Sequence, residues 1–590
     1  MSTLQDYLRN CVRSVSVEGD RLPVAIAIGV IVLVSGILML PIWWIGLPGS
    51  GHDTVTHVAW QRAFSSQLWA GELYPRWLAD MNTGLGSPAF FIYPPVSQFV
   101  AAVLAPWSDS VAWAYQRIGI AATVAFVGSG IGGYLWLRKL TSNSVSALVG
   151  AMVFLAAPYH LFIDTYYRSA YAELWAFTWA PFSLLAIHLM RDRARLPLIL
   201  YSVATSALLL SHAPSCIALL PAYIAYAALL SVIHKQKGIF LWTCVATGIA
   251  ILLAGAYLGT ALTHQAYINT GALYGGNFDF GRSFLFSAAQ WNQPKLKQAI
   301  TAITLVQSSA IIVLGIMTIR SEVDRSRKWF ASAAVAVSLV ILFMMSSISM
   351  PVWAAISVLQ KIQFAWRLLV LQTVCLAMIA ALFSASTHAR ALARPGVVRR
   401  AMTPLLIAGL VAINLAMGFL HAPAFTTTTP KPRDAPEYQL GSITKIEGLF
   451  DDGNAVALLS GEGKVSLVKM ASRDIALQVD AVTPVTFIVR HFYYPGWQCA
   501  TPGGPAHCKV TKYDDSLSVV RVDTGPGKQH MTLHLAPGPA EKAGWYATLA
   551  GLVLLVGLCL FFPRPQSRSI PRQAAVQPAV PATEATGSGV

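Results

Sequence analysis

Long apolar runs are the feature that most constrains the fold of this chain. Of its 590 residues, 55% are hydrophobic and only 12% are charged, which is about half the charged fraction of a soluble domain. Roughly twelve runs approach the 20 residues that a helix needs to cross a bilayer. We therefore expect a mainly α, polytopic membrane protein. The runs are 24–46, 112–137, 144–159, 172–190, 197–211, 214–233, 238–262, 298–319, 329–349, 367–388, 401–420 and 544–562.

The positive charge of the chain indicates topology. The net charge of +16 could suggest a nucleic-acid partner, but the basic residues fall in short clusters between apolar runs, such as Arg138 with Lys139 and Arg399 with Arg400. Such clusters mark cytoplasmic loops. This pattern excludes nucleic acid and predicts a multi-pass protein of the bacterial cytoplasmic (inner) membrane, in contact with membrane lipids. It places residues 1–23 and the Pro- and Ala-rich tail at 563–590, which we expect to be disordered, in the cytoplasm.

The same orientation puts the other loops outside the cytoplasm. The first external loop is 47–95, within a membrane domain at 24–420, and the largest external segment is 421–543. In that segment apolar and polar residues alternate over short runs separated by Gly and Pro, as at 475–479 and 531–535. This period of two predicts an antiparallel β-sandwich-like domain. The run at 544–562 then returns the chain to the cytoplasm.

Two of the seven cysteines lie in the external segment. Cys499 and Cys508 flank a loop rich in Pro and Gly. In an oxidising compartment they are expected to form a disulfide, worth about 2–3 kcal/mol for so short a loop; the alternative is two free thiols. The other cysteines are isolated and are interpreted as small apolar residues.

Ionisable residues are concentrated at the outer ends of the runs. The runs 214–233, 238–262, 298–319, 329–349 and 544–562 contain no Asp, Glu, Lys or Arg. An ion-coupled transporter usually carries such groups near the midplane of the membrane. The pattern therefore favours a site at the outer interface. The outer residues are His52, Asp53, His57, Arg76, His160, Asp164, Arg168, Glu173, His212, Lys361 and Arg367.

Asp53 lies in the run GHDTVTH, where the first apolar segment meets water. A helix is expected from Thr54 to Ala70, and Asp53 and His57 are four residues apart, so they share its face. Asp53 suits an N-cap, worth about 1 kcal/mol. It equally suits a general base toward an acceptor hydroxyl, or a ligand of a divalent cation such as Mg or Mn. From the residues alone, a capping role and a catalytic role for Asp53 are about equally well supported.

Other charged residues each have two interpretations. Arg76 could bind a phosphate or anchor the loop at the interface. Arg168 and Glu173 are most simply an ion pair, although Glu173 could join Asp53 on a metal. Arg367 could reach outward as an anchor or hold the phosphate of a lipid carrier. Its neighbour Trp366 could cover an isoprenoid chain or a sugar ring, and His212 is a hydrogen-bonding residue at the interface more often than a ligand.

Several motifs together resemble a known family. HDTVTH, GELYPRW and NTGLGSPAFFIYPP in the first loop are followed by YRSAYAELWA at 167–176, SHAPS at 211–215, IQFAWRLL at 362–369 and PGW at 495–497. They resemble the bacterial pyruvoyl-tetrahydropterin synthase-related multipass membrane proteins, except that Ala365 stands where that family usually has Pro. Nothing in the chain suggests a pterin enzyme. The architecture instead resembles the GT-C class of membrane glycosyltransferases.

The resemblance to the GT-C class implies a function. Such enzymes move a sugar from a polyprenyl-phosphate carrier to a glycan or lipid acceptor outside the cytoplasm, and they carry an essential acid in the first external loop. Asp53 stands at the matching place. The predicted site thus has Asp53 as the catalytic residue, and Asp53 with Glu173 as metal ligands. The predicted substrate-binding residues are His57, Arg76, Tyr93, Arg168, Glu173, His212, Trp366 and Arg367.

Two other classes of function stay open. A transporter or flippase for lipid or polysaccharide would need a polar path through the membrane, and a non-catalytic scaffold for envelope assembly would use the β domain for binding. Clustering of Asp53, Arg76, Glu173 and Arg367 around one outer cavity would favour the enzyme, whereas scattering of these residues would favour the scaffold.

Overall fold

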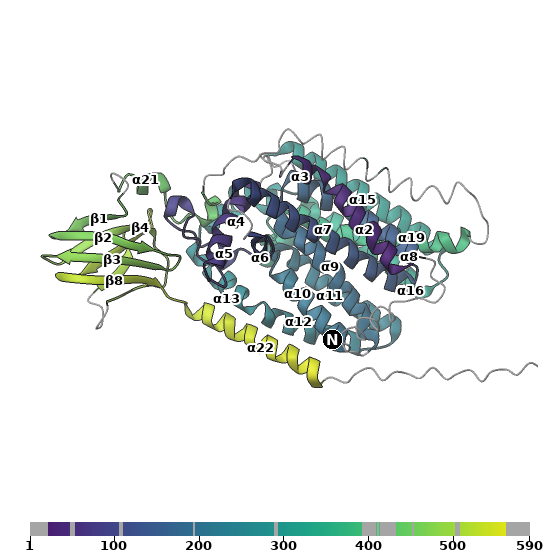
Figure 1. Ribbon diagram of the computed structural model, residues 1–590. Helices are drawn as coiled ribbons and strands as arrows, with labels where there is room; N and C mark the ends of the chain where they lie inside the picture. Colours follow the sequence, from purple (N-terminus) through teal and green to yellow (C-terminus); the bar gives the residue numbers. More distant parts are fainter. Residues whose placement is uncertain are drawn as a thin grey trace, which may run out of the picture.

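A helical bundle and a β domain at one end of it make up the protein, as the computed structural model shows (Figure 1). The predicted run at 401–420, the tail and His52 lie outside the described residues, apart from two isolated positions of the run. The structure describes residues 22–45, 47, 53–105, 110–192, 195–287, 293–391, 409, 412, 432–450, 454–501 and 508–561.

The expected multi-pass helical architecture is present. Within the described ranges, seven helical segments are long and apolar enough to cross a membrane, or eight if one bent pair is a single span. The count of about twelve is therefore not confirmed. The seven segments are α7 (Val111–Thr141), α8 (Ser144–Ala156) with η3 (Tyr159–Tyr167), α11 (Ala213–His234), α15 (Pro294–Ser321), α16 (Arg325–Met345), η9 (Ala365–Leu368) with α19 (Leu369–Ala391), and α22 (Pro539–Phe561).

Two predicted runs are interrupted. The run at 24–46 forms α2 (Val24–Leu38) and the short α3 (Leu40–Ile45), which are separated at Met39. The run at 238–262 bends by 73° between α12 (Gly238–Leu253) and α13 (Gly255–Thr263). Helix α9 (Tyr171–Leu189) and the shorter α10 (Arg195–Leu209) complete the bundle. Apolar content alone does not report such breaks, because both halves of a broken helix stay hydrophobic.

Small residues explain why the bent pair packs against α22. A Cβ atom added at Gly255 would lie 2.9 Å from the carbonyl oxygen of Gly544, and one added at Gly259 would lie 2.7 Å from that of Ala540. The backbones therefore approach as closely as small residues permit in membrane helix pairs. The other side of α22 exposes apolar residues, among them Leu552 at 47% exposure.

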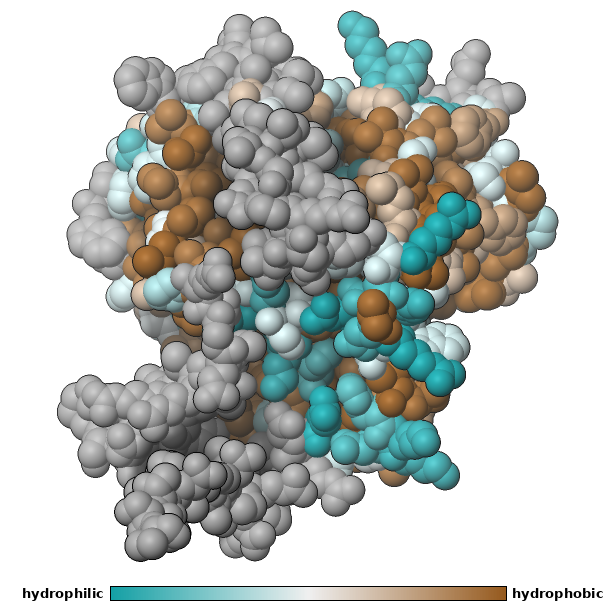
Figure 2. All heavy atoms as spheres, turned by 90° about the vertical axis from the view of Figure 1, so that its right-hand side faces the viewer, coloured by the Kyte–Doolittle hydropathy of each residue, from teal (hydrophilic) through white to brown (hydrophobic). Residues whose placement is uncertain are grey.

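The two ends of the bundle differ in charge. Helix α7 begins beside the first external loop, where Arg117 Nη2 donates to Gln61 Oε1 at 2.5 Å. Its last turn carries Arg138 and Lys139, of which Arg138 is about 41 Å from the first residue of the helix at 1.5 Å per residue. Figure 2 views the bundle from this far end, where hydrophobic residues cover both sides. The basic loops and the first external loop thus lie at opposite ends, as the charge pattern predicts.

The β domain is an antiparallel sandwich, as the sequence predicts. Its two four-stranded sheets have the orders β1-β4-β7-β6 and β2-β3-β8-β5, and alternate residues such as Ile475, Leu477 and Val479 are buried between them. The strands are β1 (Val456–Ser460), β2 (Gly463–Met470), β3 (Asp474–Ala481), β4 (Val485–Phe492), β5 (Trp497–Ala500), β6 (Cys508–Lys512), β7 (Val519–Thr524) and β8 (Gly527–Leu535).

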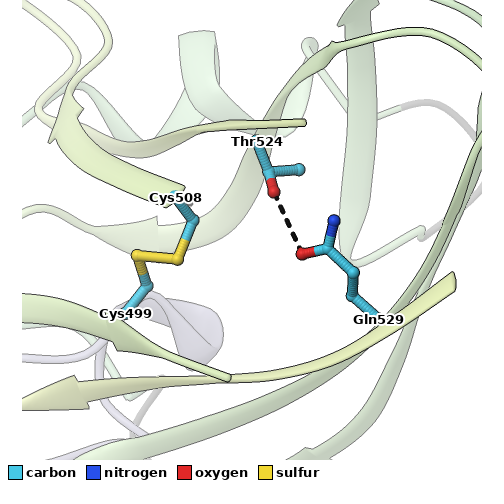
Figure 3. Close-up of a disulfide and its surroundings, with 4 residues drawn as sticks. All are labelled: Cys499, Cys508, Thr524 and Gln529. Atoms are coloured by element: carbon cyan, nitrogen blue, oxygen red, sulfur yellow. Dashed lines mark hydrogen bonds between the residues drawn. A yellow bond between two sulfur atoms is a disulfide. The ribbon is translucent and has the colours of Figure 1, made fainter. Parts of the chain in front are cut away.

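A disulfide joins the two sheets (Figure 3). Cys499 on β5 and Cys508 on β6 are bonded with an S–S distance of 2.02 Å, which confirms the predicted pair. Nearby, Thr524 at the end of β7 donates a hydrogen bond of 3.3 Å to Gln529 Oε1 on β8. Both contacts link strands of different sheets and so hold this end of the sandwich together.

The first external loop shares a hydrophobic core with the β domain. It contains α4 (Thr54–Trp69), η1 (Asn82–Gly84), α5 (Ala89–Ile92) and α6 (Val96–Val103). Trp77 stacks on His491 with ring centroids 5.2 Å apart, and Phe492 donates its amide to Leu85 at 2.8 Å. Gly86 has φ +87°, and a Cβ there would lie 2.5 Å from the Trp77 ring, so only glycine fits. The loop is thus a rigid platform between bundle and sandwich.

Candidate active site

Asp53 lies at the N-cap position of α4, but its side chain makes no capping hydrogen bond. The backbone N–H of Asp53 donates to the carbonyl of Arg168 at 3.2 Å. The half-buried carboxylate has no hydrogen bond or salt bridge to any residue that the structure describes. Asp53 thus occupies the N-cap position without the side-chain hydrogen bond that a capping role requires, and its carboxylate is free to interact with a ligand.

A buried cluster of charges lies beside Asp53. Arg168 Nη1 is 2.8 Å from Asp164 Oδ1 and 2.9 Å from Glu173 Oε2. Glu173 Oε2 is also 3.8 Å from Arg367 Nε, and its other oxygen accepts a 2.7 Å hydrogen bond from Tyr159. The expected pair of Arg168 and Glu173 is confirmed. Glu173 in addition connects the two arginines, so it orients both guanidinium groups.

Irregular backbone brings this cluster to Asp53. Segment η3 is a π-helix, in which the Arg168 amide donates to Ile163 O five residues earlier at 2.8 Å. Ser169 follows in the left-handed region, with φ +58°, and its hydroxyl accepts from Thr54 at 2.7 Å. Such π-turns and positive φ values at residues other than glycine are concentrated at functional sites.

Arg367 and Trp366 come from the start of the last helix of the bundle proper. Arg367 Nη1 donates to Ile362 O at 2.9 Å and to Gln363 Oε1 at 2.6 Å. Its Nε is buried and has no hydrogen-bond partner among the described residues. Trp366 is 2% exposed, and the Arg168 guanidinium lies 5.3 Å from its ring centroid. Trp366 therefore supports Arg168, while contact of its ring with a substrate stays a prediction.

The remaining predicted residues near Asp53 are aromatic or neutral. His57 is buried; its Nδ1 lies 3.2 Å from Gln98 Nε2 and its Nε2 lies 3.5 Å from the Tyr93 hydroxyl. Burial lowers the pKa of His57, and the charge of Asp53 opposes this only in part. His57 is thus an uncharged imidazole that orients Tyr93. His212 lies at the edge of the cluster, with its Nε2 4.0 Å from Glu173 Oε2.

The segment that leads into the β domain adds two carboxyls that sequence reasoning missed. Asp434 accepts hydrogen bonds from Trp60 Nε1 at 2.5 Å and Asn82 Nδ2 at 3.2 Å. Glu437 lies in η11 (Pro436–Tyr438). Burial raises the pKa of Glu437 to about 7, and the charges of Asp53 and Asp434 add to this shift. Burial likewise raises the pKa of Asp434 to about 6. Neither residue has a recognisable motif, so no sequence signal identified them.

Arg76 does not join this site, contrary to expectation. Its Nε is 3.2 Å from Glu541 Oε1, and its other nitrogens donate to Thr260 Oγ1 at 2.9 Å and Ala256 O at 2.7 Å. The reason is that the loop after α4 folds toward α13 and α22, where Glu541 needs a counter-ion. Of the four residues expected to cluster, Glu173 and Arg367 are 3.8 Å apart. Asp53 is joined to the same cluster through the Arg168 carbonyl, whereas Arg76 lies elsewhere.

The donor set gives no support for a resident metal ion. In the described part of the chain, no group of three or more His, Cys, Asp and Glu side chains could hold one. Both oxygens of Glu173 already accept from Tyr159 and Arg168. A divalent cation on Asp53 and Glu173 therefore stays a prediction from the sequence, and no chemical step is assigned to it.

Comparison with known protein families and with curated proteins finds no match, so the resemblance to the pyruvoyl-tetrahydropterin synthase-related family is not supported. Among solved structures, the mycobacterial arabinofuranosyltransferase AftD is similar at 13% identity and TM-score 0.39, over 68% of this chain and 27% of that one. The Archaeoglobus fulgidus oligosaccharyltransferase is similar at 12% identity and TM-score 0.40, over 73% and 57%. ArnT from Cupriavidus metallidurans, bound to undecaprenyl phosphate, has 11% identity and TM-score 0.29, over 61% and 78%.

The chain thus spans 27% and 57% of the first two of these proteins. All three TM-scores are below 0.5, so neither a fold nor an activity is transferred from them.

Proposed function

We propose that this protein is an integral-membrane glycosyltransferase. It moves a sugar from a polyprenyl-phosphate-linked donor to a glycan or lipid acceptor on the side of the membrane opposite the basic loops. The observation that carries the proposal is the free carboxylate of Asp53 next to the buried cluster of Arg168, Glu173 and Arg367. This pairing supplies a base and a cation at the boundary of the membrane.

Asp53 is proposed to act on the acceptor. The acceptor hydroxyl oxygen attacks the anomeric carbon of the donor sugar, and its proton passes to the Asp53 carboxylate. A general base needs only hydrogen-bond reach to this proton. Because no described residue forms a hydrogen bond with the Asp53 carboxylate, an acceptor hydroxyl can donate one to it.

Arg367 is proposed to act on the donor. The bond between the anomeric carbon and the phosphate oxygen breaks, and its electron pair stays on that oxygen. A guanidinium stabilises this growing charge, since its planar donors match a phosphate. Arg367 Nε lacks a hydrogen-bond partner, whereas Arg168 is held by two carboxylates. Arg367 is therefore the phosphate ligand, and Glu173 and Arg168 are positioning residues.

The alternatives have less support. The proposed transporter or flippase requires a polar path, but the ionisable residues described above lie at the outer end of the bundle, and the five uncharged runs offer none. A scaffold predicts scattered residues, yet Asp53, Glu173 and Arg367 gather from three distant segments of the chain.

Mass spectrometry of envelope glycans and lipids tests the proposal. Cells lacking the protein are compared with cells that express the wild type or Asp53→Asn. The wild type is expected to restore a glycosylated product that Asp53→Asn does not restore. Full restoration by Asp53→Asn contradicts the proposal. If cells that lack the protein accumulate an intact lipid-linked glycan, and none of their products lacks a sugar linkage, the result supports the flippase instead.

A further inference from the structure

A second polar cleft lies at the far end of α4 from Asp53. It encloses about 630 Å³. The loop after α4 supplies Glu72 and Tyr74, the β domain supplies Arg473 and Asp474, and the start of α22 supplies Glu541 and Trp545. Three parts of the molecule that are distant in sequence thus form one cavity beside the membrane boundary.

The charges in this cleft are largely paired with one another. Arg473 Nη2 is 3.1 Å from Glu541 Oε1, and its Nε is 3.8 Å from Glu72 Oε1. Arg76 also pairs with Glu541, at 3.2 Å. Asp474 accepts from His534 at 2.7 Å. Carboxylates outnumber guanidiniums here, so the cleft does not attract an anion such as a phosphate.

Three buried polar atoms of the cleft nevertheless make no hydrogen bond within the described part of the chain, although two of them, Arg473 Nε and Glu72 Oε1, form an ion pair at 3.8 Å. Glu72 Oε1, Tyr74 Oη and Arg473 Nε have no hydrogen bond to a described residue. A buried polar group without a hydrogen bond is destabilising. Glu72 Oε1 is a hydrogen-bond acceptor, Arg473 Nε is a donor, and the Tyr74 hydroxyl can both donate and accept. A ligand that satisfies all three must itself donate and accept, as sugar hydroxyls do.

An aromatic face completes the cleft. Trp545 is 47% exposed although it lines the cavity. A partly exposed indole presents an apolar surface with a polar edge, which suits the C–H face of a pyranose or furanose ring. The cleft thus combines one aromatic face with many polar side chains that can form hydrogen bonds.

We infer that this cleft binds a neutral oligosaccharide, which is the remote part of the acceptor glycan. The inference rests on the proposed function, because it assigns the far end of the same acceptor whose hydroxyl meets Asp53. Helix α4 connects the two places: Asp53 precedes its first residue and Gln67 near its end lines the cleft. Its 16 residues span about 24 Å, a distance that an oligosaccharide bridges and a single sugar does not.

Binding of oligosaccharides to the full-length protein in nanodiscs tests the inference. The probes are maltohexaose, mannohexaose and arabinohexaose, measured by saturation-transfer NMR and equilibrium dialysis. At least one is expected to bind the wild type, and Trp545→Ala or Glu72→Gln to weaken it at least tenfold. Trp329→Ala, which removes an indole of 48% exposure from α16, is the matched control and should bind normally.

The outcomes separate this inference from the proposed function. Asp53→Asn is expected to bind the hexasaccharide normally while it loses transfer. Trp545→Ala is expected to raise KM for hexasaccharide acceptors at least tenfold and to leave kcat with a monosaccharide acceptor unchanged. The inference is overturned if no probe binds the wild type, if the cleft variants bind like Trp329→Ala, or if the cleft takes a lipid headgroup and no glycan. None of these results affects the role of Asp53.

Discussion

Two buried arginine–glutamate clusters adjoin the first external loop, and they differ in what they leave unpaired. Around Arg76, all three guanidinium nitrogens have partners in Glu541, Thr260 and Ala256. Around Arg367, by contrast, Nε has no hydrogen bond and the nearby Asp53 carboxylate is free. Arg76 itself thus fastens the loop to α13 and α22, at the edge of the proposed oligosaccharide cleft. The arginine of the second cluster instead keeps one nitrogen without a hydrogen bond to a described residue.

The largest expected effect concerns the Arg76 cluster. Arg76→Met leaves Glu541 partly uncompensated in a buried position, and removal of one partner of such a pair costs about 3–5 kcal/mol. We expect a marked fall in Tm of the detergent-solubilised protein, with unchanged transfer per folded molecule to a monosaccharide acceptor at low temperature. Partial recovery of Tm in Arg76→Met/Glu541→Leu is the control. Unchanged Tm together with lost transfer would place Arg76 in the site and abolish the contrast.

Substitution of Arg367 is expected to have the opposite signature. Arg367→Gln removes the proposed phosphate contact and should lower kcat/KM about 10²-fold, or about 2.7 kcal/mol. The fall in Tm should be smaller than for Arg76→Met, because Glu173 keeps Arg168 and Tyr159 as partners. Lys361→Gln, a nearby basic residue stacked on Tyr274, is the control and should retain activity. If Arg367→Gln transfers sugar at the wild-type rate, the two clusters do not differ in function.

The disulfide joins β5 to β6 within the β domain and belongs to neither cluster, so its loss should affect stability alone. The variant Cys499→Ser/Cys508→Ser frees β5 from β6 and is expected to cost about 2–3 kcal/mol of β-domain stability. Protease sensitivity of the external domain, with and without reductant, measures this effect. Loss of transfer at a temperature where the domain stays folded would show that the sandwich contributes to the reaction.

A smaller effect is expected from the carboxyls that join the β domain to the loop. The pKa of Glu437 is raised to about 7 and that of Asp434 to about 6, so the folded protein binds more protons than the unfolded chain between about pH 4 and 7. Stability from these groups is present at low pH and is lost as pH rises through 6 to 7. Tm of Glu437→Gln/Asp434→Asn should therefore depend less on pH in this range. An unchanged pH slope would contradict the burial of these carboxyls.

Much of the architecture follows from local patterns in the sequence. Apolar length predicts membrane helices such as α7 and α15, and alternation at 475–479 predicts the sandwich. Cys499 and Cys508 are predicted from their loop and their compartment. The 73° bend after Leu253 is not predicted. The glycines of α13 that follow it pack against α22, a distant contact that no local pattern records.

The site is predicted only where its residues are close in sequence. Asp53 with His57, and Arg168 with Glu173, have spacings that a helix or turn brings together. Arg76 is misassigned because its partner, Glu541, is 465 positions further along the chain, so the sequence offers no sign that its charge is already neutralised. Glu437 is missed for a related reason: its raised pKa comes from burial in the folded molecule.

The rate of sugar transfer by purified Asp53→Asn in nanodiscs tests the central claim most directly. The donor is a radiolabelled polyprenyl-phosphate sugar, and the acceptor is the envelope fraction from cells that lack the protein. Asparagine preserves the shape of the side chain and, since the Asp53 side chain makes no capping hydrogen bond, the fold. The account predicts an unchanged Tm and a rate lowered by at least about 10²-fold, the usual contribution of a general base. Transfer at the wild-type rate would contradict it.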